Sequence, residues 1–194
     1  MTATKLKPLV DFGIQCGLSQ ELIEELVPLG KLLNIKTYEN LIEVGGKANS
    51  TFFVLKGGFI NQHYDEQTEA FKTVQFHLTD YQPFITVLDS YFENKRSNNQ
   101  IKAFTNSDVL AFNRSDLDSF LNNNIEFTRF YFKMLIQLLI SENQFKTNLI
   151  CLTPEQVYKY IIHNYPQISQ KVPSKYIAEF LGITPQWLSK LKIR

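Results

Sequence analysis

The sequence contains few cysteines and no long apolar run, and both absences narrow what the protein can be. Its two cysteines, Cys16 and Cys151, are too few and too far apart for a disulfide framework or a thiolate metal site. No stretch approaches the roughly 18 to 20 consecutive apolar residues that span a bilayer. Residues 1–8 lack the apolar segment and the cleavage site of a secretory signal. We therefore expect a cytoplasmic protein with no membrane partner.

Basic and acidic residues are nearly balanced over the whole chain, but basic residues are concentrated at the C-terminus. The 194 residues carry a formal net charge of +1, which argues against a protein that coats DNA by charge alone. Residues 171–194 contain five basic residues and one acidic residue, so this segment carries +4 and the remainder of the chain is acidic. With 44% apolar residues, the chain can form a core in one large domain or two small ones.

The first half of the chain has the period-two pattern of short strands. A helix is predicted from Ser19 to about Leu33, and after it apolar residues alternate in short runs rich in Phe, Val and Ile. Turn signals such as Gly45-Gly46 and Gly57-Gly58 separate the runs. This spacing is typical of a small antiparallel barrel or jelly roll. The predicted strands are 33–38, 41–44, 51–56, 59–64, 71–78, 101–105 and 109–112.

A long helical segment follows the predicted strands and a short helix over 115–121. It covers residues 126–150 and is apolar on more than one face, so it needs two packing partners. We predict that one partner is the protein's own barrel and the other a second copy of the chain. The alternative is a helix buried entirely within its own domain. The predicted dimer seam consists of Phe127, Tyr131, Met134, Leu138 and Phe145.

The C-terminal segment has the pattern of a helix over 153–165, followed by two short helices joined at Gly182. Pro173 suits the first turn of one helix, and Thr184 is a good N-cap for the next. Gly182 can adopt the left-handed conformation that ends a helix. On the last helix we expect an apolar inward face of Trp187, Leu188 and Leu191. The outward residues are then polar or basic, as a helix in a DNA major groove requires: Gln186, Ser189, Lys190, Lys192 and Arg194.

Three stretches together resemble the Crp/Fnr family of bacterial transcription regulators. Residues 41–46, Leu-Ile-Glu-Val-Gly-Gly, and 52–59, Phe-Phe-Val-Leu-Lys-Gly-Gly-Phe, resemble the glycine-punctuated strands of a cyclic-nucleotide-binding-type β-roll. The long Phe- and Leu-rich helix follows in the family's order. Residues 171–190, Lys-Val-Pro-Ser-Lys-Tyr-Ile-Ala-Glu-Phe-Leu-Gly-Ile-Thr-Pro-Gln-Trp-Leu-Ser-Lys, are similar to its helix-turn-helix and form the most specific of the three stretches.

The resemblance implies an α+β fold in three parts. Residues 1–125 would form a jelly-roll sensor domain, 126–150 a dimerisation helix, and 151–194 a winged-helix-like helix-turn-helix domain. It also implies a homodimer that binds double-stranded DNA at a two-fold-related site, with RNA polymerase as a further partner. The groove-facing residues carried over from the family are Thr184, Pro185, Gln186, Ser189 and Lys190, with Lys192 and Arg194 on the DNA backbone.

The ligand site departs from the family pattern. The nucleotide-binding members carry Phe-Gly-Glu on the roll, whereas residues 82–88 here read Gln-Pro-Phe-Ile-Thr-Val-Leu. The Arg-Ser pair stands upstream of its expected position, in a polar, Asn-rich loop. We therefore expect that the roll does not bind cyclic AMP tightly, and we predict no cofactor while leaving an unknown small-molecule effector open. The candidate effector pocket consists of Phe84, Ile85, Thr86, Val87, Arg96 and Ser97.

Two other function classes compete with a DNA-binding regulator. One is a small-molecule or cyclic-nucleotide-binding module that does not recognise DNA. The other is a jelly-roll metal enzyme, for which His63, His77 and a carboxylate at Glu66 or Glu69 give only a loose imitation of the metal-ligand spacing. The sequence favours the regulator and argues against an enzyme.

Overall fold

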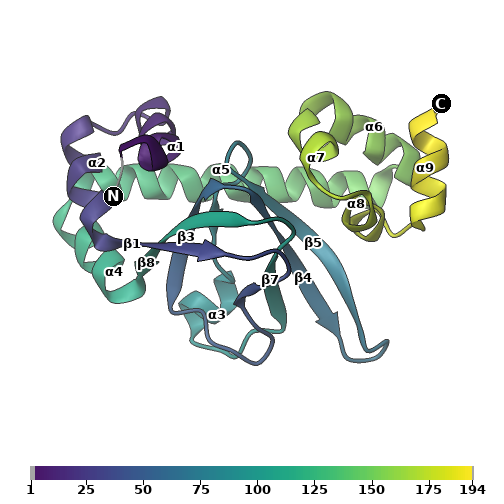
Figure 1. The fold of residues 1–194 in the computed structure, drawn as a ribbon, viewed down its shortest axis with the longest axis horizontal. Coiled ribbons are helices and arrows are strands. Elements are labelled where there is room, and N and C mark those ends of the chain that lie inside the picture. Colours follow the sequence, from purple (N-terminus) through teal and green to yellow (C-terminus); the bar gives the residue numbers. More distant parts are fainter. Residues whose placement is uncertain (1–2, 194) are drawn as a thin grey trace.

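The computed structural model describes residues 3–193 and shows two helical regions at opposite ends of a β-roll (Figure 1). The N-terminal region contains α1 (Ala3–Gln15), α2 (Gln20–Leu26) and a 3-10 helix (Val27–Leu29). The roll follows, and α5 (Ile125–Cys151) then runs along it to the C-terminal helices. Among the helices that the structure describes, none combines the length and apolar content needed to cross a bilayer.

The roll is built from two four-stranded antiparallel sheets, with strand orders β1-β8-β3-β6 and β2-β7-β4-β5. Its interior is closed by large apolar side chains, among them Phe59, Ile101 and Val109, which are fully buried. The predicted jelly roll is therefore confirmed. The strands are β1 (Gly30–Ile35), β2 (Asn40–Ile42), β3 (Ser50–Lys56), β4 (Gly58–Asp65), β5 (Ala70–Leu78), β6 (Phe84–Ile85), β7 (Asn99–Ala103) and β8 (Ser107–Asn113).

The first strand begins three residues earlier than the sequence pattern predicts. Pro28 lies in the 3-10 helix that ends the helical segment at Leu29, and Gly30 then pairs with Phe112 of β8. A side chain at residue 30 would collide with Leu110, because a Cβ there would lie 2.4 Å from its Cγ. The prediction of a helix up to Leu33 is therefore wrong, because the sheet takes the chain from Gly30 onward.

Four short or interrupted elements are absent from the sequence prediction. They are α1, which contains Pro8, the two-residue strand β6, α3 (Leu88–Glu93) and α7 (Pro166–Lys171). The first is held by tertiary packing, since Leu6 and Leu9 are buried in a cluster with Phe53 of β3. Elements this short depend on such contacts more than on local periodicity.

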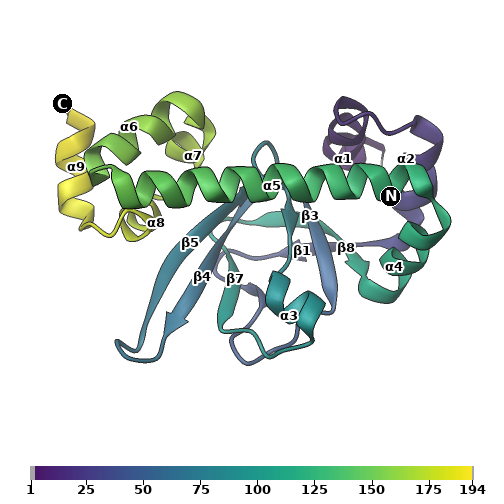
Figure 2. The ribbon, with the colours of Figure 1, turned by 180° about the vertical axis from the view of Figure 1, so that it is seen from behind.

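Helix α5 follows α4 (Arg114–Asn123) and has two different faces. At 27 residues it is about 40 Å long. Phe127 and Phe130 on its inner face are buried with the N-terminal helices, and Phe145 is buried with the C-terminal ones. Figure 2 shows α5 in front of both sheets, so that its other face points away from the roll.

The C-terminal helices share one core with the outer face of sheet β2-β7-β4-β5. They are α6 (Pro154–Asn164), α7, α8 (Ser174–Phe180) and α9 (Pro185–Ile193). Thr153 and Gln156 form the capping box that begins α6, and the predicted cap is confirmed. Ile161 and Ile177 of these helices are fully buried in a cluster that includes Ile60 and Phe76 of the roll.

Candidate DNA-binding interface and effector pocket

Helices α8 and α9 form a tight helix-turn-helix. Gly182 has φ +66°, the left-handed conformation predicted for the turn, and its N–H donates to the Glu179 carbonyl at 3.1 Å. The hydroxyl of Thr184 accepts from the backbone N–H of Trp187 at 3.2 Å, so the predicted cap of α9 is present. Ala178 is fully buried where the helices approach each other. The turn therefore fixes α9 firmly against α8.

The outward face of α9 is polar, basic and uncovered. Gln186, Ser189 and Lys190 are exposed, as are Thr184 and Pro185 before them. On the opposite side, Leu188 is fully buried and Leu191 is half-buried against the same core. Of the two remaining predicted contacts, the side chain of Lys192 and the whole of Arg194 lie outside the described residues.

Trp187 does not face inward as the sequence pattern suggested. Its side chain is 42% exposed on the flank of α9. Successive helical residues are about 100° apart, so Leu188 and Trp187 cannot both point at α8. Leu188 occupies the inward position, and the indole is left beside the polar face.

The predicted effector residues are only partly brought together. Phe84, Ile85 and Thr86 line a cavity of ≈ 50 Å³ between β6 and α5, next to a second cavity of ≈ 190 Å³ that also contains Phe84. Both volumes are smaller than the roughly 300 to 1,000 Å³ of common ligand pockets. Val87 is buried in the roll core instead.

The Arg-Ser pair of the predicted pocket is placed elsewhere. The Arg96 side chain is exposed, and its Nη1 donates to the Gly45 carbonyl at 3.0 Å. Ser97 is fully buried, and its hydroxyl donates to the Asn99 carbonyl at 2.7 Å. Neither residue lines the two cavities. The prediction that Val87, Arg96 and Ser97 belong to one pocket is therefore wrong.

A buried histidine that was not among the predicted pocket residues faces the smaller cavity. His77 on β5 is 2% exposed, and its Nδ1 lies 2.9 Å from the Gln82 carbonyl oxygen. Within the described chain, its Nε2 has no hydrogen-bond partner. Burial lowers the pKa of His77 to about 4, so the ring is neutral at physiological pH.

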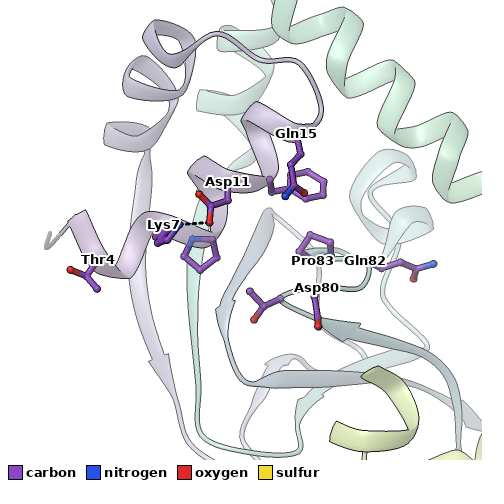
Figure 3. A pocket seen from close by; sticks show the side chains of 10 residues that line it. Thr4, Lys7, Asp11, Gln15, Asp80, Gln82 and Pro83 are labelled. Carbon is purple, nitrogen blue, oxygen red and sulfur yellow. Dashed lines mark hydrogen bonds and ion pairs between the residues drawn. The ribbon is translucent and has the colours of Figure 1, made fainter. Parts of the chain in front are cut away.

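A further hollow is an open groove of ≈ 550 Å³ beside α1. Figure 3 shows Thr4, Lys7, Asp11 and Gln15 of α1 on one side, and Asp80, Gln82 and Pro83 of the loop after β5 on the other. Its charged groups are paired, because Lys7 contacts Asp11 at 2.7 Å and Asp80 contacts Lys171 at 2.7 Å. Over the same residues 3–193, no group of three His, Cys, Asp or Glu side chains could hold a metal ion.

The predicted dimer seam on α5 lies on the inner face of the helix. Phe127 and Phe145 are buried within the protomer, while Tyr131 and Met134 pack against the N-terminal cluster and Leu138 lines both cavities. Phe127 and Phe145 are therefore not available to a second copy in this protomer, whereas Tyr131, Met134 and Leu138 are half-buried. A different set of apolar residues, between 41% and 73% exposed, forms a stripe on the outer face: Ile125, Phe132, Ile136, Leu139, Ile140 and Ile150.

Solved structures of Crp/Fnr regulators share this architecture over most of the chain. FixK2 from Bradyrhizobium japonicum is 13% identical, with a TM-score of 0.69 over 84% of this chain and 83% of that one. The c-di-GMP-responsive global regulator CLP from Xanthomonas campestris is 11% identical, with a TM-score of 0.69 over 89% of both chains. The catabolite activator protein of Thermus thermophilus is 12% identical, with a TM-score of 0.55 over 91% of this chain and 83% of that one.

No protein-family model and no curated protein sequence matches the chain. At these identities the likeness lies in the fold. The roll, the long helix and the C-terminal helices occur in the same order as in the Crp/Fnr regulators, as the sequence resemblance predicted.

Proposed function

We propose that the protein is a homodimeric transcription regulator that binds double-stranded DNA through α9. The observation that carries the proposal is the uncovered face of Gln186, Ser189 and Lys190, set behind the tight turn at Gly182. A helix of this kind fits the major groove, where side chains reach base edges. The +4 charge of residues 171–194 favours approach to phosphates, and the matched regulators have the same fold.

Each outward side chain has a chemical role available to it. The amide of Gln186 can form two hydrogen bonds with adenine N6 and N7, and Lys190 can reach guanine or a phosphate. The hydroxyls of Thr184 and Ser189 suit phosphate oxygens. Lys192 and Arg194 extend the basic segment along the DNA backbone. Pro185 and Gln186 stand where the family usually has charged residues, so the preferred DNA sequence is this chain's own.

Dimerisation in this proposal uses the outer stripe of α5. Five of its six members, all but Ile140, fall at the a and d positions of a two-stranded coiled coil, and the remaining a and d positions carry Arg129, Asn143 and Lys146. The d positions are Ile125, Phe132, Leu139 and Lys146, and the a positions are Arg129, Ile136, Asn143 and Ile150. All eight are exposed in the protomer. A parallel pair of α5 helices would hold both copies of α9 at the same end of the dimer.

The proposal is tested by DNA binding with the single tryptophan as the reporter. A duplex is first selected from a random library, and the emission of Trp187 is then recorded during titration with it. We expect an emission change, and an affinity that falls steeply with salt because counterions are released. Lys190→Ala should weaken binding by about tenfold or more, since one good base contact is worth about 1 to 3 kcal/mol.

The control is Lys159→Ala, which removes an exposed cation from α6, where it pairs with Glu155. It should leave the affinity within about twofold, because exposed ion pairs contribute little. No emission change with any selected duplex, or equal affinities for the Lys190 variant and the wild type, would refute the proposal.

A second, narrower proposal concerns the effector. The Nε2 atom of His77 is unpartnered in a wall that is mostly apolar but also contains Gln75 and Thr86, so the cavity suits a small, largely apolar molecule with one hydrogen-bonding group. No Lys or Arg among the described residues lines either cavity, whereas a cyclic nucleotide needs a cation for its phosphate. We expect no heat of binding with cyclic AMP in calorimetry. Micromolar binding of cyclic AMP would overturn this view of the pocket.

A further inference from the structure

A row of hydrogen-bonded polar side chains crosses the outer face of sheet β2-β7-β4-β5. Asn40 on β2 donates its amide to Gln100 on β7 at 3.4 Å, and Gln100 donates to Gln62 on β4 at 2.9 Å. Gln62, Gln100 and Thr73 of β5 are in register, because Gln62 pairs with each of the other two. All three are at least 95% buried. Polar groups this deep in a sheet are stable only when their hydrogen bonds are made.

The row ends on the helix-turn-helix unit. The Oε2 atom of Glu179 on α8 accepts from Gln62 Nε2 at 2.8 Å, from the Thr73 hydroxyl at 2.5 Å and from the Thr73 backbone N–H at 3.1 Å. Three donors from two strands of the roll therefore converge on one carboxylate oxygen. Hydrogen bonds to a charged acceptor are about twice as strong as neutral ones.

Glu179 is also part of the turn that orients α9. Its backbone carbonyl accepts from the N–H of Gly182, and the neighbouring Ala178 carbonyl accepts from Ile183 at 3.0 Å. Leu188 of α9 is buried in the core that these helices share with the roll. A movement of Glu179 relative to the sheet therefore moves the turn and α9 with it.

Further contacts hold α7 and α8 against the roll. The ring of Phe180 lies 5.1 Å from that of Phe76 on β5, centroid to centroid, and Lys171 contacts Asp80 at 2.7 Å. The apolar pair would tolerate small sliding, whereas the three hydrogen bonds at Glu179 weaken when their distances and angles change. The docked unit keeps the outward face of α9 uncovered.

We propose that Glu179 is a positioning residue, which fixes the helix-turn-helix unit on the β-roll so that the two α9 helices of the dimer are held in place for DNA. The inference rests on the proposed function and adds the contact that sets the position of α9 relative to the β-roll. If the contact is lost, each unit moves more freely, and binding of both half-sites must then order two mobile units at once. The sheet that carries the amide row also becomes the route by which a change in the roll reaches α9.

The test uses the full-length protein with three substitutions. Glu179→Ala removes the acceptor, Glu179→Gln keeps one carbonyl acceptor at the same place, and Thr73→Val removes one donor from the roll side without changing the helix-turn-helix. Lys159→Ala is again the control, because it removes an exposed charge of the same domain from α6. Two quantities are measured: the affinity for the selected duplex, and the hydrogen-exchange rate of the Thr73 amide.

The expected order is the same for both quantities. Glu179→Ala should speed exchange at Thr73 and weaken DNA binding by about tenfold or more, which is the scale of losing hydrogen bonds to a charged group. Glu179→Gln should recover part of both effects, Thr73→Val should show a smaller loss of affinity, and Lys159→Ala should match the wild type.

Two results would overturn the inference while the proposed function stands. In the first, Glu179→Ala binds DNA as tightly as the wild type although its Thr73 amide exchanges faster. The contact would then be merely structural. The other is higher affinity in Glu179→Ala, which would make the contact inhibitory. Failure of the proposed function itself is recognised separately, because the wild type would then bind no selected duplex.

Discussion

The two faces of α5 are similar in apolar content but opposite in their surroundings. The inner face inserts Phe127 and Phe145 into two separate clusters of the protomer, one at each end of the molecule. The outer face leaves Phe132, Leu139 and Ile150 more than 40% exposed. Exposed apolar patches of this kind are typical of interaction surfaces rather than of free solvent-facing helices. The inner face, which stabilises the fold, and the outer face, which is proposed to contact the second copy, therefore differ in burial and not in hydrophobicity.

The largest expected effect breaks the outer face alone. Phe132→Asp combined with Leu139→Asp places four charges in the proposed dimer seam, and each buried charge costs several kcal/mol. We expect the dimer dissociation constant to rise by more than about a thousandfold, so that sedimentation velocity shows monomers.

The control for the outer face is Gln137→Asp, which adds one charge at an exposed position of the same helix that is not an a, d, e or g position of the proposed seam. It should leave the dimer intact. An unchanged dimer in the Phe132 and Leu139 double variant would refute the outer seam.

The next effect breaks the inner face. Phe127→Ala removes a ring that is 1% exposed and packs against Phe120 and Phe130 at centroid distances of 5.0 and 5.6 Å. Such a truncation lowers the free energy of unfolding by about 3 to 5 kcal/mol. Both substitutions are made in a Leu139→Asp background, so that dissociation of the dimer does not contribute. Urea denaturation should show the full loss for Phe127→Ala, whereas Phe132→Ala should change the free energy of unfolding by less than about 1 kcal/mol. Equal losses for the two rings would contradict the assignment of the faces.

A pH effect is expected at the cavity beside the inner face. The pKa of His77 is lowered to about 4 by burial, whereas an unfolded histidine titrates near 6.5. Because the folded state binds a proton less readily than the unfolded state, stability is complete above pH 6.5 and falls as the pH drops toward 4. The loss is about 3 kcal/mol at most.

His77→Gln keeps a polar side chain but removes the titration. Thermal unfolding between pH 7 and 4 should therefore be less dependent on pH in this variant than in the wild type. Parallel pH profiles of the two proteins would contradict a neutral buried His77.

The smallest expected effect concerns the register of the coiled coil proposed for the outer face. Asn143 is a polar residue at an a position of the proposed coiled coil, where such a residue fixes register at a cost in stability. Asn143→Ile should strengthen the dimer by about tenfold while allowing other registers, which cross-linking between introduced cysteines would detect. A weaker dimer in this variant would argue against the assigned register.

The sequence predicts the order of the parts better than the direction of individual side chains. The period-two pattern located seven of the eight strands, and the predicted 126–150 helix differs from α5 by one residue at each end. The dipeptide strand β6 carries no periodic signal of its own, since its pairing with Phe52 and Phe53 comes from the sheet. The faces of α5 could not be told apart because both are apolar.

The candidate DNA-binding surface shows the same division. The cap at Thr184 and the left-handed Gly182 follow from local chemistry, and both are confirmed. Hydrophobicity alone predicts an inward Trp187, whereas in the structure Leu188 fills that position. The bonds of Glu179 to Gln62 and Thr73 join residues more than 100 positions apart, and no local pattern could reveal them.

The most direct test of a dimer that places two α9 helices on DNA is hydroxyl-radical footprinting of the selected duplex. We predict two symmetric protected segments whose centres are about one helical turn, roughly 34 Å, apart. Lys190→Ala should lose both segments together, because the two copies of α9 are equivalent. A single asymmetric segment, or protection that Lys190→Ala leaves unchanged, would contradict the account.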